Sequence, residues 1–257
     1  MLAAPRGNTA LTRLVVLQHL EREGPGLFAL EAQARGWELE ICRLDRGDPL
    51  PQLQAGDRLL VLGGPMGVAD VGDPAYPWLE MELQLLRKML RTGQPVIGVC
   101  LGAQLLAVAA GGSAQPMRVG DSATPFREVG FGAVSWWPDP QREPLLQGLD
   151  PSQLVLHWHG DRCLLPAHAD VLASTLHCRE QAFRVAPAAY GLQFHVELQA
   201  DTLELWLLED EAFVVGALGP DGPQRIRADA QRWGVALQRE GRRLIGNLFN
   251  QFERLQP

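Results

Sequence analysis

The segment whose residues are best suited to chemistry is PVIGVCLGAQLLAVAAGG, Pro95 to Gly112. In it, Cys100 stands between two glycines in the pattern G-x-C-x-G. An apolar run of strand type ends at this cysteine, and a run with helical spacing begins at Leu101. A nucleophile with this spacing is typical of a strand-to-helix turn that presents its side chain over the edge of a sheet. A packed thiol beside two turn glycines is the alternative.

The same turn would change the chemistry of the thiol. A free cysteine has a pKa of about 8.5, and the positive end of a helix lowers it, which favours the thiolate that attacks carbonyl carbon. The first free N–H groups of the helix, notably that of Leu101, can also hold the oxyanion of a tetrahedral intermediate. One turn would therefore supply a nucleophile, its activation and part of an oxyanion hole.

A cysteine nucleophile needs a base, and His195 is the best candidate among the histidines. It ends the strand-like run YGLQFHVEL, and Glu197 follows two residues later. Residues two apart in an extended segment share a face, so the Glu197 carboxylate could fix the tautomer of the ring and stabilise the imidazolium. An edge strand with alternating polar residues is the alternative. The other histidines are His19, His157, His159, His168 and His177.

Strands and helices alternate in the first half of the chain, which is typical of a parallel sheet covered on both faces. The chemistry of such sheets gathers at the carboxyl ends of the strands, where the glycine turns at Gly63-Gly64 and around Cys100 would lie. From about residue 111 to 197 strand-like pieces dominate, and residues 201–257 are expected to be helical, with breaks near Gly234 and Gly241. We predict an α/β fold: a three-layer, flavodoxin-like open sheet with mostly parallel central strands, helices on both faces and antiparallel additions.

Composition limits the partners. The 257 residues include 23 basic and 30 acidic side chains, a net charge of -7, so we expect no nucleic-acid and no membrane partner. No apolar run is long enough to span a bilayer, and the start MLAAPRGNTALTR lacks the pattern of a secretion signal, so a cytoplasmic location is expected. The four cysteines are widely spaced, which favours reduced thiols.

A zinc site could be assembled only from Cys163, His168, His177 and Cys178, whose spacing matches no common zinc pattern. Ordinary strand and loop roles are preferred for these four residues. We therefore predict no metal site and no cofactor.

Three segments together, GVCLGAQLLAVAAGG, LVLGGPMGV and YGLQFHVEL, resemble the class I glutamine amidotransferase family of the triad type. The similarity runs from about Leu14 to Leu198 and is greatest to stand-alone members similar to the glutaminase domain of GMP synthetase. It implies a nucleophile at Cys100, a general base and then acid at His195, and an orienting acid at Glu197. The domain is expected to span residues 1–200, with a helical C-terminal extension, residues 201–257, packed on it.

The resemblance also implies further site residues. Gly64 in GGPMG and Leu101 would be the backbone oxyanion donors, and Gln104 would contact the substrate glutamine. HWHGD resembles a segment that borders the substrate pocket, which makes His159 and Asp161 candidate substrate contacts. Valine replaces the proline of the HPE that many relatives have, and its extended backbone should keep the His–Glu geometry.

Three functions stay open at this point. The first is a glutaminase that releases ammonia through a cysteinyl thioester and passes it to a separate synthetase subunit, because the chain contains neither an SGGxDS stretch nor a G-x-x-x-x-G-K-[ST] loop. The second is a stand-alone hydrolase or peptidase of small γ-glutamyl compounds. The third is a non-catalytic regulatory or binding module with the same fold. The expected small-molecule partner is glutamine or another γ-glutamyl compound.

Overall fold

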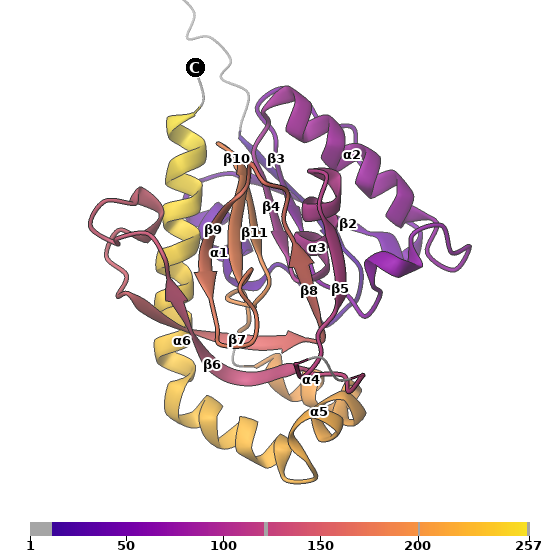
Figure 1. Cartoon of the computed structure of the whole chain (residues 1–257). Coiled ribbons are helices and arrows are strands. Elements are labelled where there is room, and N and C mark those ends of the chain that lie inside the picture. Colours follow the sequence, from indigo (N-terminus) through magenta and orange to yellow (C-terminus); the bar gives the residue numbers. More distant parts are fainter. Residues whose placement is uncertain (1–11, 121–122, 200, 256–257) are drawn as a thin grey trace, which may run out of the picture.

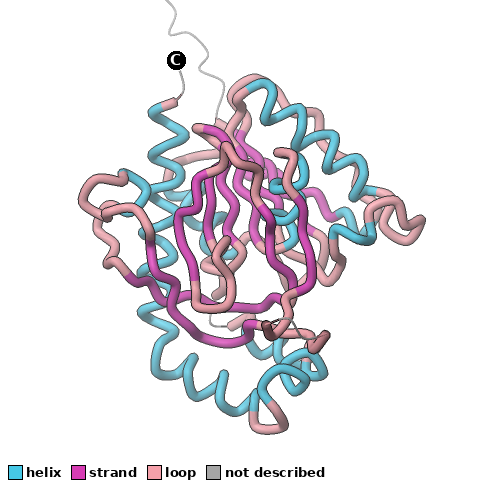
Figure 2. Tube along the Cα trace, in the orientation of Figure 1, coloured by secondary structure: helices cyan, strands magenta, loops and turns pink. Residues whose placement is uncertain are grey.

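The computed structural model describes residues 12–120, 123–199 and 201–255. The prediction that the chain does not start with a secretion signal concerns residues that are not described. Residues 1–11 lie outside the described part of the chain. Figures 1 and 2 show a twisted sheet with helices packed around it. The strands are β1 Arg13–Gln18, β2 Glu38–Arg43, β3 Arg58–Val61, β4 Val96–Val99, β5 Ser113–Pro116, β6 Glu128–Trp136, β7 Ser152–His159, β8 Asp161–Leu164, β9 Asp170–Ser174, β10 Ala182–Ala186 and β11 Ala189–Leu192. The helices are α1 Gly26–Ala34, α2 Trp78–Thr92, α3 Leu101–Ala109, α4 Leu203–Glu209, α5 Glu211–Leu218 and α6 Gly222–Arg254.

The main sheet has nine strands in the order β2-β1-β3-β4-β11-β10-β9-β6-β7. Neighbouring strands from β2 to β11 are parallel, and the remaining pairs are antiparallel. Strands β5 and β8 form a separate antiparallel pair. The parallel core therefore places the ends of β1, β3, β4 and β11 at one edge, and the predicted fold class is confirmed.

Alternation along β1 explains the three layers. Leu14 and Val16 pack into one hydrophobic cluster with residues of α1 and α6, whereas Val15 and Leu17 pack into another with residues of α2 and α3. All four side chains are fully buried, as expected for a central parallel strand. The sheet is thus covered on both faces, and its carboxyl edge stays open for chemistry.

The prediction that the C-terminal helical region breaks near Gly234 and Gly241 is wrong, because α6 runs unbroken from Gly222 to Arg254. Figure 1 shows its first part below the sheet and its later part along one side of the sheet. A Cβ atom at Gly241 would lie 2.5 Å from the carbonyl oxygen of Val196. Glycine is thus needed here for close packing, which offsets its poor helix propensity.

Within the described residues, no helix is both long enough and apolar enough to cross a membrane.

Candidate active site

Cys100 occupies the turn between β4 and α3, with φ 51° and ψ -108°. It is the single non-glycine residue with positive φ among those the structure describes. Backbone strain of this kind costs about 1–3 kcal/mol and is found most often at functional positions. The turn carries Cys100 to the carboxyl edge of the sheet, and its side chain borders a pocket there.

The two flanking glycines are explained by backbone packing. A Cβ atom at Gly98 would lie 2.3 Å from the carbonyl oxygen of Gly102, and one at Gly102 would lie 2.1 Å from the carbonyl oxygen of Val61. Both distances are far below van der Waals contact, so α3 can approach β3 and β4 this closely only with hydrogen at these positions. The spacing G-x-C-x-G is therefore a requirement of the turn that presents Cys100.

His195 and Glu197 lie beyond the end of β11 and form a buried pair. Nδ1 of His195 is 2.5 Å from Oε1 of Glu197. Burial opposes the charged imidazolium, but the Glu197 carboxylate and a hydrogen bond with the Cys100 sulfur raise the pKa of His195 well above its usual 6.5. Because Nδ1 of His195 is bonded to Glu197, the other ring nitrogen, Nε2, is available to the thiol.

Backbone contacts hold this pair in place. The N–H of Val196 donates to Oε2 of Glu197 at 2.9 Å, a hydrogen bond that proline at this position could not make. At the start of α1, the N–H of Leu27 donates to the Glu197 carbonyl at 2.9 Å. His195 exchanges two backbone hydrogen bonds with Leu156 of β7, 2.8 and 3.1 Å long. The histidine is therefore fixed from both sides.

The glycine loop after β3 faces Cys100. A Cβ atom at Gly63 would lie 2.3 Å from Oε2 of Glu23, 3.2 Å from Cε1 of His195 and 3.4 Å from Cβ of Cys100. Three side chains of the pocket thus converge on one α-carbon, which leaves no room for a larger residue. Gly64 and Leu101 border the same pocket as Cys100.

The pocket has a volume of about 360 Å³ and brings together most of the residues that the sequence singled out. Glu197 is the exception, because it contacts the far side of the His195 ring. Gln104 is buried, and its side-chain amide donates to Oε1 of Gln193 at 3.4 Å. The expected residues in the pocket wall are Gly64, Cys100, Leu101, Gln104, His159, Asp161 and His195.

Several pocket residues were missed by the sequence analysis. Arg22 and Glu23 follow β1, and their place after the first strand of a parallel sheet could have indicated them. Asp210 lies between α4 and α5, and Phe213 lies on α5, so no local pattern connects them with Cys100. The helical C-terminal region therefore contributes directly to the pocket.

An ionic and aromatic network joins these missed residues. Arg22 contacts Asp210 at 2.5 Å and Glu209 at 2.7 Å, and the indole N–H of Trp158 donates to Asp210 at 2.9 Å. Trp206 of α4 packs edge-on against the His195 ring with centroids 4.8 Å apart, and its indole N–H donates to the Arg22 carbonyl at 3.0 Å. These contacts exclude water from one side of His195.

Two carboxyl groups that line the pocket, those of Glu23 and Asp161, have a raised pKa. Burial raises the pKa of Glu23 above its usual 4.5, although the charges of His195 and Arg22 oppose that shift. A cationic ligand would stabilise the charged form of such a buried carboxylate. Burial also raises the pKa of Asp161, which lines the same pocket.

The model of the class-I glutamine amidotransferase family matches residues 29–215 of this chain. The fold and the cysteine turn thus define an α/β glutamine amidotransferase domain, and the chain belongs to this family. It is 28% identical over 195 residues to the glutamine amidotransferase-like protein YfeJ of Salmonella typhimurium, covering 75% of this chain and 78% of that protein. It is 29% identical over 165 residues to the GMP synthase of Cytophaga hutchinsonii, covering 63% of this chain but only 29% of that larger protein.

Solved structures agree on the fold. A glutamine amidotransferase from Methylobacillus flagellatus superposes with a TM-score of 0.78 at 26% identity, over 95% of each chain. One from Thermotoga maritima has a TM-score of 0.79 at 24% identity, over 94% of this chain and 97% of that one. The expected family resemblance is confirmed.

Proposed function

We propose that this chain is a glutaminase that hydrolyses the side-chain amide of glutamine through a γ-glutamyl thioester on Cys100. The single observation that carries the proposal is that the Cys100 thiol and His195 line one pocket, with buried Glu197 hydrogen-bonded to the ring of His195. Family membership supports glutamine as the substrate class. Roles for individual residues follow from the contacts described above.

In the first half of the reaction, His195 takes the thiol proton and the Cys100 thiolate attacks the amide carbon. The raised pKa of His195 favours the imidazolium that this transfer creates. The tetrahedral intermediate then collapses as the imidazolium gives its proton to the amide nitrogen. The C–N bond breaks, ammonia leaves, and a thioester to Cys100 remains.

In the second half, His195 accepts a proton from water, and the resulting hydroxide attacks the thioester carbon. Collapse breaks the C–S bond, releases glutamate and restores the thiol. Backbone N–H groups of Gly64 and Leu101 would stabilise the oxyanion in both halves. Leu101 is the first residue of α3, so its N–H has no acceptor within the helix.

The charges around the pocket suit the rest of a glutamine molecule. Carboxylates of Glu23 and Asp210 can receive an α-ammonium group, and the Arg127 guanidinium lies in the same wall for an α-carboxylate. Gln104, His159 and Asp161 are proposed as further substrate contacts. Glutamine would then be held at both ends, with its amide carbon presented to Cys100.

The test is turnover of glutamine by the purified full chain, read as glutamate and ammonia, beside labelling by the reactive glutamine analogue 6-diazo-5-oxo-norleucine. We expect one label per chain on Cys100 and a loss of at least about 100-fold in turnover for Cys100→Ala. Cys163→Ala is the matched control, because this thiol is buried and lies outside the pocket wall. Absence of both labelling and turnover would favour a non-catalytic module.

A γ-glutamyl hydrolase is the second candidate function, and the lining of the pocket supports it. Beyond Cys100 the wall continues over Phe126, Trp158 and Phe213, an apolar surface that ammonia does not need. Comparing glutamine with a panel of γ-glutamyl dipeptides decides between the two substrates. Preference for the dipeptides would support the hydrolase, whereas glutamine turnover that rises with an added synthetase subunit would support transfer of ammonia to a partner.

A further inference from the structure

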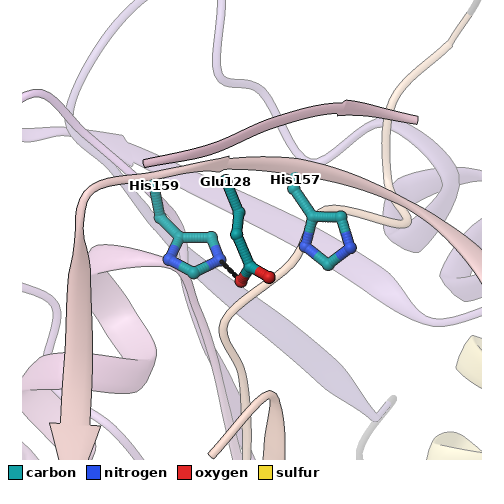
Figure 3. A group of neighbouring side chains, drawn as sticks. All are labelled: Glu128, His157 and His159. Atoms are coloured by element: carbon teal, nitrogen blue, oxygen red, sulfur yellow. Dashed lines mark ion pairs between the residues drawn. The ribbon is translucent and has the colours of Figure 1, made fainter. Parts of the chain in front are cut away.

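A second cluster of functional side chains lies beside the active site on the antiparallel part of the sheet. Glu128 begins β6, and its register partner on β7 is His159. His157, two residues earlier on β7, shares the face of His159. Figure 3 shows the two imidazole rings on either side of the Glu128 carboxylate, each with a nitrogen turned toward it. One potential ligand atom from each residue lies within 4.8 Å of the other two.

The hydrogen bonds of His159 orient its Nε2 toward the Glu128 carboxylate. Its Nδ1 lies 2.9 Å from the carbonyl oxygen of Asp161, which can only accept, so Nδ1 carries the proton. Its Nε2 lies 3.2 Å from Oε2 of Glu128. The Gln181 side-chain amide lies 3.4 Å from the same Nε2, a contact that a metal ion at this nitrogen would replace. An Nδ1–H donated to a backbone carbonyl is also the usual arrangement of a metal-binding histidine.

His157 supplies an unsatisfied buried nitrogen. Its Nδ1 has no hydrogen-bond partner among the described residues. The opposite edge of the ring faces Gly132, where a Cβ atom would lie 2.8 Å from Cδ2 and 3.0 Å from Nε2. His157 is only 5% exposed, so its Nδ1 is a buried and unpartnered potential ligand atom.

The carboxylate is held in place by its own neighbours. The Thr175 hydroxyl donates to Oε1 of Glu128 at 2.7 Å, and the Gln181 amide donates to Oε2 at 2.5 Å. Hydrogen bonds of this kind orient a ligating carboxylate and increase the affinity of the site. Glu128 is thus restrained before any ion arrives.

We propose that Glu128, His157 and His159 bind a divalent transition-metal ion of the Zn²⁺ type. Two histidines and one carboxylate form a ligand set that zinc accepts, with a fourth position left for water. Zinc–nitrogen bonds of about 2.0–2.1 Å hold tetrahedral ligand atoms roughly 3.4 Å apart, so side-chain rotations must draw the three ligand atoms closer. The spacing in sequence could not indicate this set, because β6 and β7 bring its members together.

The site adjoins the catalytic machinery. Trp158 lies between the two histidines, and its carbonyl oxygen is 3.9 Å from Sγ of Cys100. His159 also borders the substrate pocket. A bound ion would link β6 to β7 through side chains and restrain the segment that forms this wall. Metal binding itself does not depend on the proposed glutaminase activity.

The parent protein of the test is the full chain with the substitution Cys100→Ala. This substitution removes the Cys100 thiol as a competing metal ligand. After treatment with a chelator, the protein is titrated with Co²⁺ while visible absorption is followed, and Zn²⁺ binding is measured by competition. We expect one ion per chain with the spectrum of a four-coordinate site. Adding Glu128→Gln or His157→Ala should weaken binding at least about 100-fold.

His168→Ala is the matched control, because His168 is exposed and lies outside the cluster. It should bind as the parent does. Circular dichroism verifies that each variant is folded, and Glu128→Gln keeps the size of the side chain if His157→Ala does not fold. No bound ion in the parent, or equal affinity in the parent and Glu128→Gln, would overturn the proposal.

Discussion

The imidazole of His19 connects Glu82 of α2 with the glycine loop that faces Cys100. Its Nε2 lies 2.9 Å from Oε1 of Glu82, and its Nδ1 lies 2.9 Å from the carbonyl oxygen of Gly63. Both partners are acceptors, so both nitrogens carry protons. Burial opposes this charge, but the Glu82 carboxylate outweighs it and the pKa of His19 is raised above 6.5. Because the peptide group is planar and trans, fixing the Gly63 carbonyl turns the Gly64 N–H to the opposite side.

His19→Gln should therefore lower kcat for glutamine more than it changes KM. Losing one oxyanion donor costs about 100- to 1000-fold, and misorienting the Gly64 N–H should cost part of this, about 10- to 100-fold. Glu82→Gln should show the same kinetic effect and destabilise the fold by about 3 kcal/mol, because it breaks a buried ion pair whose carboxylate keeps His19 protonated. Glu80→Gln, exposed on the same helix, is the control and should change neither quantity. Wild-type kcat in folded His19→Gln would contradict this role.

Glu197→Gln should reduce kcat by about 1000- to 10,000-fold, as removal of the orienting acid does in comparable hydrolases. The amide cannot stabilise the imidazolium, so the pKa of His195 should fall. A raised histidine pKa stabilises the fold below its ordinary 6.5, and this stabilisation is lost as pH rises through the folded value. The variant should therefore lose most stability near pH 6 and less at higher pH, measured by urea unfolding. Glu204→Gln, whose side chain is exposed, is the control for a lost carboxylate.

Local patterns explain why the sequence can indicate the candidate centre. Cys100 is marked by glycines whose spacing follows from backbone packing on Val61, and His195 and Glu197 are neighbours in one extended segment. Each of these signals lies within a few residues. A single sequence is enough to indicate them because the residues of each signal are neighbours in the chain, although the contact that requires Gly102 is with Val61 on a distant strand.

The rest of the site arises from packing between distant segments. Asp210 and Phe213 reach the pocket because α4 and α5 cover the end of β7, and nothing in their own neighbourhood indicates that contact. The helix breaks were wrongly predicted for a related reason, because the role of the glycine depends on packing against a distant segment. Gly241 looks like a helix terminator in the sequence, yet it permits close contact with Val196 in the fold.

Gly102→Ala should destabilise the protein by about 3 kcal/mol or more, because the added methyl group would meet the Val61 carbonyl at 2.1 Å. The strain falls on β3 and on the turn at Cys100, so turnover per folded molecule should fall as well. Gly234→Ala is the matched control. No atom lies within 4 Å of its added Cβ, so this helical position should gain about 0.5–1 kcal/mol. Chemical denaturation of both variants is the measurement, and equal stability would contradict the packing argument.

Glu23→Gln should stabilise the protein while weakening substrate binding. The pKa of Glu23 is raised by burial, so keeping it ionised costs stability at pH values above its folded pKa, and this cost vanishes below its ordinary 4.5. The variant should melt at a higher temperature than the wild type at pH 7 to 8, and the difference should disappear toward pH 4. If Glu23 receives the α-ammonium group, KM for glutamine should rise about tenfold with a smaller change in kcat. Exposed Glu21→Gln is the control and should change stability by less than about 0.5 kcal/mol. If stability rises and KM is unchanged, Glu23 is not a substrate contact, and only the argument that its buried charge lowers stability holds.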